Sequence, residues 1–224
     1  MDPLSEPLTF RNLTVKNRVF RSNVSGQFDH YDGSGGDARI QWELKFARGG
    51  VGAIISSFVP VSLRGRIAVN YGTIHRDEFI PFWRELGERV QEYDCRFIMQ
   101  LSHAGRQRDL PTAGYPRGLS STAKPEQLHG FECDRMTHDD IAMVVREFAE
   151  GARRVARHRR RAVDLSVGHP DGARVAPRQS AGNAPGRAER QGQAPQCTAV
   201  FAGGPSAGHA GAGVACLSRR VAGK

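Results

Sequence analysis

The sequence predicts an α/β fold built from parallel strands, and two observations support this prediction. Short apolar runs typical of buried strands alternate, over residues 1–170, with longer segments whose apolar side chains recur at helical spacing. Alternation in this order is typical of parallel strands joined by right-handed crossovers. The chain has 224 residues, of which 39% are hydrophobic and 25% charged, an ordinary composition for a globular protein with one substantial core.

A short hairpin is expected before the first complete unit. Residues 8–10 and 13–15 flank the turn-forming pair Arg11 and Asn12. We expect this hairpin to cover one end of the main sheet.

The first two units each pair a strand with an amphipathic helix. The first strand covers residues 19–26, where its end turns polar, and the second covers residues 51–57. Asp37 is expected to cap the first helix, which extends to Arg48. The second helix covers residues 78–93, where apolar side chains recur at i, i+3, i+4, i+7 and i+11.

The third unit contains the most informative strand. Residues 96–101 form an apolar run that ends abruptly in polar side chains, and ligands of parallel sheets gather just beyond the carboxyl ends of the strands. A polar loop without a function is the ordinary alternative. Residues 107–130 then form a long Pro, Gly and Ser-rich excursion, and loops of that length are usually functional or disordered. Thr137 is expected to cap the third helix. The buried stripe of that helix is expected to be Ile141, Val144, Val145, Phe148, Ala152 and Val155.

The pattern is lost after a fourth expected strand at residues 162–167. Residues 171–224 are rich in Ala, Gly, Pro and Arg and have no helical or alternating period. This composition buries too little apolar surface to offset a backbone ordering cost of roughly 1–2 kcal/mol per residue, so we expect a disordered tail. One hypothesis is that two frame errors, near residues 158 and 170, produced this composition. CGN arginine codons read out of register in GC-rich DNA become Gly, Ala and Asp codons.

Most of the net charge of +9 lies in the C-terminal part of the chain. Residues 158–224 carry ten Lys and Arg against three Asp and Glu, so residues 1–157 contribute only +2. Basic surfaces attract nucleic acids and anionic membranes. An alternative reading is therefore a non-enzymatic fragment that binds nucleic acid or acidic partners through Arg159, Arg160 and Arg161. Residues 1–157 give no such indication, so nucleic acid is not the expected partner.

The cysteines and the N-terminus favour a cytoplasmic protein with reduced thiols. The four cysteines have no CxxC or CxxH spacing, so neither zinc nor an iron–sulfur cluster is expected, and no metal site is predicted. The N-terminus has no basic segment leading into an apolar one, and no apolar stretch approaches about 18 residues, so no membrane span is expected. Serine-hydrolase, zinc-protease, Walker and dinucleotide-binding motifs are also absent from the sequence.

Four motifs follow one another in the first half of the chain. They are residues 6–18 (EPLTFRNLTVKNR), 47–55 (ARGGVGAII), 65–66 (GR) and 100–106 (QLSHAGR). In this order they resemble the Old Yellow Enzyme family of NADH:flavin oxidoreductases, in particular its 2,4-dienoyl-CoA reductase-like branch, over residues 6–157. The resemblance implies the N-terminal half of a (β/α)8 TIM barrel, with FMN lying across the carboxyl ends of the strands and NAD(P)H as reductant.

The resemblance assigns six residues to FMN binding. They are Ser22, Asn23, Val24, Ser25, Phe58 and Gln100. Gln100 matches the position whose carboxamide meets the pyrimidine edge of the flavin. Residues 22–25 match the end of the first strand, which touches the ring through backbone amides, and Ser25 stands where a hydroxyl or thiol tunes the flavin. Phe58 matches a second backbone contact where the family has a smaller residue, and a plain core phenylalanine is the alternative.

His169 is the expected catalytic residue. Residues 165–169 resemble the fourth strand, whose first histidine binds the carbonyl oxygen of the substrate. The second polar member of this clamp would stand at Gly172, and a tyrosine proton donor would stand at Arg174, so at most one member of the clamp is kept. His103 and Arg106 belong to the last motif. Arg106 is expected to hold the rim or to approach phosphate, and a solvated loop arginine is the ordinary alternative.

The reaction implied by the resemblance is hydride transfer from NAD(P)H to flavin N5 and then to a small molecule, either an activated alkene or an enoyl thioester. In the family the FMN phosphate is held after strands seven and eight, and a basic residue on strand five lies beside the flavin. The sequence supplies neither. We therefore expect this chain to be truncated and nearly inactive by itself, with its oligomeric state left open.

Overall fold

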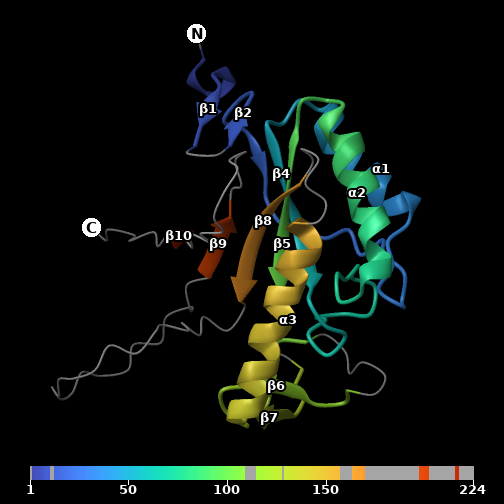
Figure 1. The fold of residues 1–224 in the computed structure, drawn as a ribbon, viewed down its shortest axis with the longest axis vertical. Helices are drawn as coiled ribbons and strands as arrows, with labels where there is room; N and C mark the ends of the chain where they lie inside the picture. The colour runs from blue at the N-terminus through green and yellow to red at the C-terminus, as the bar shows by residue number, and fades with distance from the viewer. Residues whose placement is uncertain are drawn as a thin grey trace, which may run out of the picture.

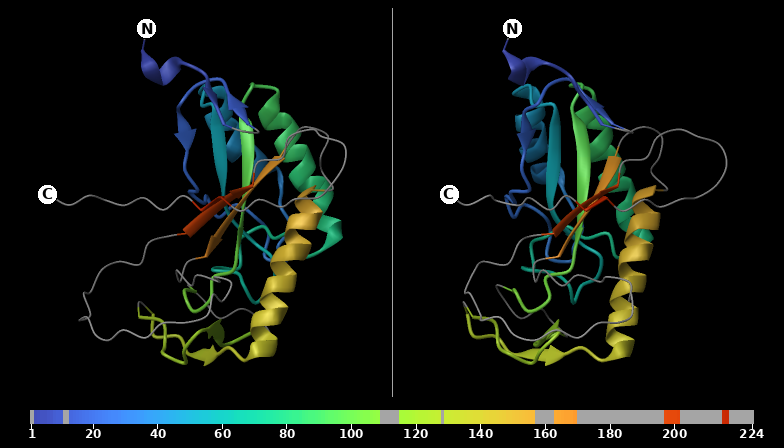
Figure 2. Two further views of the ribbon diagram at one scale, coloured as in Figure 1. Left: turned by 60° about the vertical axis from the view of Figure 1, so that its left-hand side comes forward. Right: turned by 90° about the vertical axis from the view of Figure 1, so that its left-hand side faces the viewer.

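A six-stranded sheet covered on one face by three helices forms the centre of the computed structural model (Figures 1 and 2). The model describes residues 2–10, 13–108, 115–127 and 129–156, and the strands Val163–His169, Cys197–Phe201 and Ala215–Cys216. The strand order is β10-β9-β8-β5-β4-β3.

Four neighbouring strands run parallel, as the alternating pattern predicts. They are β3 (Phe20–Arg21), β4 (Ala53–Pro60), β5 (Arg96–Ser102) and β8 (Val163–His169). Because they run in the same direction, their carboxyl ends lie at the same edge of the sheet. Strand β4 begins and ends later than expected, whereas β5 lies within one residue of its prediction.

The outer edge of β8 is covered by a strand that the sequence pattern does not predict. Strand β9 (Cys197–Phe201) lies antiparallel to β8, and β10 (Ala215–Cys216) lies antiparallel to β9. The residues of β9 include Thr, Val and Phe, which favour strands even inside a segment of low overall hydrophobicity. The rest of residues 171–224 lies outside the described residues, so the expected disorder there stays a prediction.

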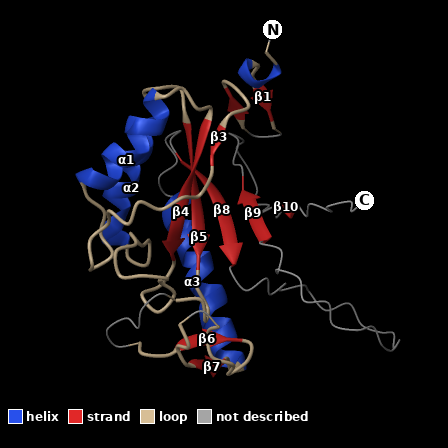
Figure 3. Ribbon diagram, turned by 180° about the vertical axis from the view of Figure 1, so that it is seen from behind, coloured by secondary structure: helices blue, strands red, loops and turns tan. Residues whose placement is uncertain are grey.

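The helices pack on the face of the sheet that is turned toward the viewer in Figure 1. Figure 3 shows the molecule from the other side, with this face turned away from the viewer. The helices are α1 (Asp37–Arg48), α2 (Ile80–Gln91), which follows the 3-10 turn η2 (Asp77–Phe79), and α3 (His138–Ala156). The core between helices and sheet includes Leu44, Ile54, Val59, Trp83, Leu86, Phe97, Met99 and Val155. Alternate residues of β4 and β5 thus face the helices, which leaves the others to the opposite, inner face.

The start of α1 differs from the prediction. Gly36 is the N-cap, and Asp37 is the first helical residue. Its carboxylate instead accepts a hydrogen bond from Gln41 at 3.2 Å and lies 3.6 Å from the guanidinium of Arg89. A carboxylate in the first turn is still favourable because it faces the positive end of the helix dipole.

The cap of α3 agrees with the prediction, but part of its buried stripe does not. The Thr137 hydroxyl accepts a hydrogen bond from the Asp140 amide at 3.1 Å, and the Asp140 carboxylate accepts one from the Thr137 amide at 2.8 Å. Val144 is buried, whereas Ile141 and Val145 are 43% and 51% exposed. The first half of α3 extends beyond the end of the six-stranded sheet (Figure 2), so this part of the helix does not pack on that sheet.

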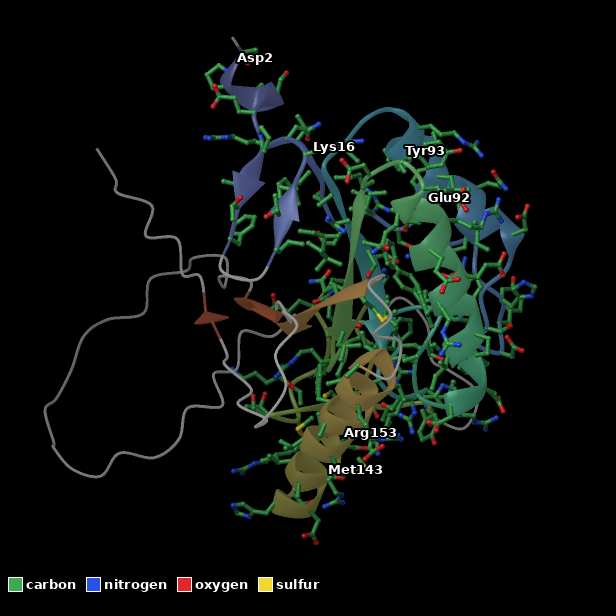
Figure 4. All side chains as sticks on the ribbon, turned by 45° about the horizontal axis from the view of Figure 1, so that its top comes forward. Asp2, Lys16, Glu92, Tyr93, Met143 and Arg153 are labelled. Atoms are coloured by element: carbon green, nitrogen blue, oxygen red, sulfur yellow. The ribbon has the colours of Figure 1, made fainter. Side chains whose placement is uncertain are left out.

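The predicted N-terminal hairpin is present and covers one end of the inner face. After the 3-10 turn η1 (Pro3–Ser5), β1 (Leu8–Thr9) and β2 (Thr14–Val15) pair antiparallel. A second apolar cluster joins the hairpin to the inner face of the sheet and consists of Leu13, Val15, Ala53 and Ile98. Lys16 donates a hydrogen bond to the Tyr93 carbonyl at 2.6 Å, which ties the hairpin to the end of α2 (Figure 4).

Among the described residues, no helix is long and apolar enough to cross a membrane.

Candidate functional site

The inner face of the sheet carries polar side chains at its carboxyl end, opposite the end covered by the hairpin. Gln100 lies two residues beyond Ile98 on β5, so both face inward, and its side chain is only 4% exposed. Phe58 on β4 is the register partner of Gln100 and is half-buried. His169 is the last residue of β8, at the same edge. The structure therefore brings three of the sequence-predicted positions to one edge, and the role of His169 stays a prediction.

A β-bulge places Phe58 on the inner face. The register of β4 against β5 shifts between Ile55 and Phe58, so the strand carries one extra residue there. The extra residue reverses the alternation, since Val59 rather than Phe58 belongs to the helix-facing core. The bulge also fixes Gln100, because the Ser56 hydroxyl accepts a hydrogen bond from the Gln100 amide at 2.9 Å. The second strand was expected to end at residue 57, and the bulge explains why it continues.

The loop after β3 is partly exposed to solvent. Ser22 and Val24 are exposed, and Asn23 and Ser25 are half-buried. The Ser25 hydroxyl accepts a hydrogen bond from the backbone amide of Gln27 at 3.0 Å. Residues 22–25 therefore form an open surface beside the inner face.

Arg21 holds this loop from below. Its Nη1 donates to the carbonyl oxygen of Ser22 at 3.0 Å and to that of Val24 at 2.7 Å. Burial, with a contribution from the nearby charge of Arg39, lowers the pKa of Arg21 to about 10, so the guanidinium remains charged at neutral pH. Both carbonyls that flank Asn23 are thus held by one buried cation.

A buried network of charges supports Arg21. Glu43 on α1 forms ion pairs with Arg21 and with Arg39, the latter at 3.0 Å, and Arg39 also pairs with Asp29 at 2.8 Å. The four side chains are at most 6% exposed. Sequence reasoning missed this network. A signal was present, because Arg39 and Glu43 stand at i and i+4 directly beside the apolar stripe of the first helix.

One hydrogen bond links the loop after β3 to β5. The Asn23 Nδ2 group donates to the Gln100 Oε1 atom at 2.7 Å. This bond passes across β4, which lies between the two strands. It joins two of the positions that the resemblance assigns to FMN.

The remaining motif residues have structural contacts. His103 is 1% exposed, and its Nδ1 atom accepts a hydrogen bond from the Gly105 amide at 3.1 Å. A Cβ atom at Gly65 would lie 2.7 Å from the imidazole ring of His103, so the close packing of these two motifs requires glycine.

Arg106 organises the rim of the sheet. It donates to the Ser120 hydroxyl at 2.7 Å, to the Thr122 hydroxyl at 2.8 Å and to the Lys124 carbonyl at 3.0 Å. Ser120 ends β6 (Gly118–Ser120), which pairs with β7 (Cys133–Arg135) inside the excursion after β5. These contacts favour the rim-holding alternative for Arg106.

Thiol and metal chemistry have no visible place in the described site. Cys95 and Cys133 are buried, and burial raises the pKa of Cys95 to about 11, which keeps its thiol protonated. In the part of the chain that the structure describes, no group of three His, Cys, Asp or Glu side chains could hold a metal ion.

Comparison with known proteins supplies the context for this geometry. Residues 3–159 match the model of the NADH:flavin oxidoreductase / NADH oxidase family. The chain is 30% identical over 174 residues to an N,N-dimethylglycine/sarcosine dehydrogenase of Chromohalobacter salexigens, covering 75% of this chain and 24% of the relative. It is 31% identical over 152 residues to an NADPH dehydrogenase of Bacillus subtilis, covering 67% of this chain and 44% of the relative.

Solved structures show the same fold. A 2-naphthoyl-CoA reductase complex matches with a TM-score of 0.67 and 20% identity, covering 73% of this chain and 27% of that protein. A morphinone reductase in complex with tetrahydroNAD matches with a TM-score of 0.62 and 23% identity, covering 74% of this chain and 49% of that protein. The chain thus spans less than half the length of each of these four proteins. These comparisons give no support to the basic-tail alternative, and Arg159 to Arg161 lie outside the described residues.

Proposed function

Because the chain belongs to the NADH:flavin oxidoreductase / NADH oxidase family, we propose that its described residues supply one side of the FMN site of an NAD(P)H-dependent oxidoreductase. In this proposal the strands β3, β4, β5 and β8 are the first four strands of a (β/α)8 barrel. The carboxyl ends of barrel strands are where such enzymes place their active sites.

The observation that carries the proposal is the state of the Gln100 side chain. It is nearly buried, and its Oε1 atom accepts a hydrogen bond from Asn23, while the backbone amide of the same residue donates to the Ser56 hydroxyl. No described residue accepts a hydrogen bond from its Nε2 group. A fixed carboxamide with a donor still available suits the carbonyl groups on the pyrimidine edge of a flavin.

The other assigned residues fit a flat, mainly apolar ring. Residues 22–25 are exposed or half-buried, and Arg21 binds the carbonyl oxygens of Ser22 and Val24. The Ser25 hydroxyl accepts from the Gln27 amide, so its own proton is free to point toward the ring. Phe58 faces the same space from β4 and would bound the ring on the sheet side. Bound FMN would supply the two-electron chemistry that passes a hydride from NAD(P)H to an acceptor.

The acceptor class is proposed to be a small molecule with an alkene conjugated to a carbonyl group, including enoyl thioesters. His169 would hold that carbonyl oxygen, because it stands at the carboxyl end of β8, next to the strand that carries Gln100. A 2-naphthoyl-CoA reductase and a morphinone reductase are among the proteins of similar fold, which is consistent with a conjugated carbonyl substrate.

Equilibrium binding of FMN to the full chain tests the proposal. We expect saturable quenching of FMN fluorescence, with a dissociation constant raised about fivefold by Gln100→Leu, since a net hydrogen bond is worth about 1 kcal/mol. Gln41→Leu is the matched control, because Gln41 lies on the exposed surface of α1 and contacts Asp37. Absence of saturable quenching, or equal affinity of the Gln100→Leu and Gln41→Leu variants, would refute the proposed site.

A further inference from the structure

Asn23 controls which end of the Gln100 carboxamide faces the inner space. A glutamine amide can turn by half a turn, which exchanges its oxygen and nitrogen at almost no cost in shape. Here the Asn23 Nδ2 group donates to Gln100 Oε1 at 2.7 Å, and this contact favours the orientation that leaves Nε2 on the other side. In this pairing the Nε2 group of Gln100, rather than its Oε1 atom, is left for a ligand.

The backbone on either side of Asn23 is held in place by hydrogen bonds. The carbonyl oxygens of Ser22 and Val24, on either side of Asn23, both accept hydrogen bonds from Arg21. The Val24 amide in turn donates to the Ser22 carbonyl at 2.8 Å. The backbone amide of Gln100 donates a hydrogen bond to the hydroxyl of Ser56. The backbones of both residues that share the 2.7 Å bond are thus held independently of each other.

We propose that Asn23 is a positioning residue that presents Gln100 to the flavin as a hydrogen-bond donor, so that this chain recognises a carbonyl oxygen of the pyrimidine edge. The proposal rests on the FMN site proposed above. It adds a role for the Asn23 side chain, which lies between the β3 loop and Gln100 and acts on the cofactor only through Gln100.

The polarity of the pair distinguishes positioning from a merely structural role. Asn23→Leu removes the hydrogen bond. Asn23→Asp keeps a hydrogen bond but reverses it, because a carboxylate accepts only and would draw Nε2 of Gln100 toward itself. A structural role is satisfied by either polarity, whereas a positioning role is not. Gln100→Glu provides the complementary change, since a carboxylate cannot donate to a carbonyl oxygen.

The experiment measures FMN dissociation constants by fluorescence for the full chain and its variants, with thermal unfolding to verify folding. We expect Asn23→Leu and Asn23→Asp each to weaken binding about fivefold, and Gln100→Glu to weaken it at least as much. The double variant Gln100→Leu, Asn23→Leu should bind FMN less than about twofold more weakly than Gln100→Leu alone, because the effect of Asn23 passes through Gln100. Asn70→Leu is the matched control, since Asn70 is half-buried like Asn23 and its Nδ2 group donates to the Gln27 carbonyl.

The outcomes separate this proposal from the one on which it rests. If the unaltered chain does not bind FMN, both are overturned. If it binds FMN and both Asn23 variants bind within twofold of it, the positioning role alone is overturned. If Asn23→Leu weakens binding but Asn23→Asp does not, the bond is structural and the assigned polarity is wrong. If Asn23→Leu fails to fold, Asn23→Asp retains the pairing and decides the question.

Discussion

Asn23 and Gln100 share a 2.7 Å hydrogen bond although β4 lies between the strands that lead to them. The bond ties the loop after β3 to the end of β5 and so fixes the spacing across three neighbouring strands. Arg21 reinforces the loop from below through the Ser22 and Val24 carbonyls. The candidate site is therefore organised by contacts within the protein before any ligand enters, which reduces the ordering cost of binding.

The buried charge network should be essential for stability. Glu43→Gln removes the carboxylate shared by Arg21 and Arg39, which leaves two buried guanidinium groups with Asp29 as the remaining anion of the network. We predict a loss of about 3–5 kcal/mol in the free energy of unfolding, measured by urea denaturation.

The control for that prediction is an exposed ion pair. Glu78 lies 3.2 Å from Arg76, and both side chains are about 60% exposed. Glu78→Gln should change the unfolding free energy by less than about 1 kcal/mol, since solvent screens such pairs. Equal losses for Glu43→Gln and Glu78→Gln would show that the network contributes no more than a surface pair.

Two adjacent valines of α3 should respond differently to the same change. Val144 is 8% exposed and Val145 is 51% exposed. Val144→Ala should cost about 1–2 kcal/mol through lost burial, whereas Val145→Ala should change the unfolding free energy by less than about 0.5 kcal/mol. The two variants share the same change in helix propensity, so the difference between them measures burial. Equal costs would mean that the outer face of α3 is covered in solution.

The contrast between these valines shows what sequence patterns could and could not predict. The strand at β5, the Thr137 cap and the helical segments follow from local patterns and were predicted within a few residues, whereas the Asp37 cap was wrong. Exposure of Ile141 and Val145 depends on how far α3 extends past the sheet, which no local pattern encodes. The bulge in β4 was missed because it depends on Ser56 meeting Gln100, 44 residues away.

The sequence predicted where the candidate residues lie in the fold but not the contacts between them, and their role in binding FMN stays a prediction. The carboxyl ends of the strands and Gln100 followed from the apolar run and the QLSHAGR motif. The bond between Asn23 and Gln100 joins residues 77 apart, and the family resemblance pointed only to the backbone of residue 23. Sequence reasoning therefore gave no indication that the Asn23 side chain has a functional contact.

The stability of the protein should fall in mild acid because of His75. Burial lowers the pKa of His75 to about 4 from its ordinary value of 6.5. The charged groups around it are Arg66, Arg76, Arg154 and Glu78, of which the three arginines lower the pKa further. Because the unfolded chain binds a proton that the native state does not accept, the free energy of unfolding should decrease as the pH falls from about 6.5 to about 4.

His75→Gln tests this assignment by urea unfolding across the same pH range. The variant should show a smaller decrease than the unaltered protein between pH 6.5 and 4, because glutamine does not titrate. Its absolute stability is not the readout, since the side chain also contacts the Thr73 hydroxyl at 2.7 Å. Identical slopes for the two proteins would assign the acid sensitivity to other groups.

Turnover by this chain alone should be low. The family resemblance assigns none of the described residues to the FMN phosphate, so binding would depend on contacts with the flavin ring. We predict that the purified chain with FMN oxidises NADPH, in the presence of an enone and without oxygen, no faster than the same concentration of free FMN. A rate well above that of free FMN would contradict this prediction.

Side-chain amide NMR is the most direct test of the contact between Gln100 and the flavin ring, because it detects weak binding and identifies the group involved. The 15N-labelled chain is titrated with riboflavin, which carries the flavin ring without the phosphate, and the Nε2 resonances of Gln100 are compared with the Nδ2 resonances of Asn70. If the flavin binds at Gln100, the Gln100 resonances shift saturably and those of Asn70 do not. If other residues respond and Gln100 does not, the flavin binds elsewhere and the proposed site is wrong.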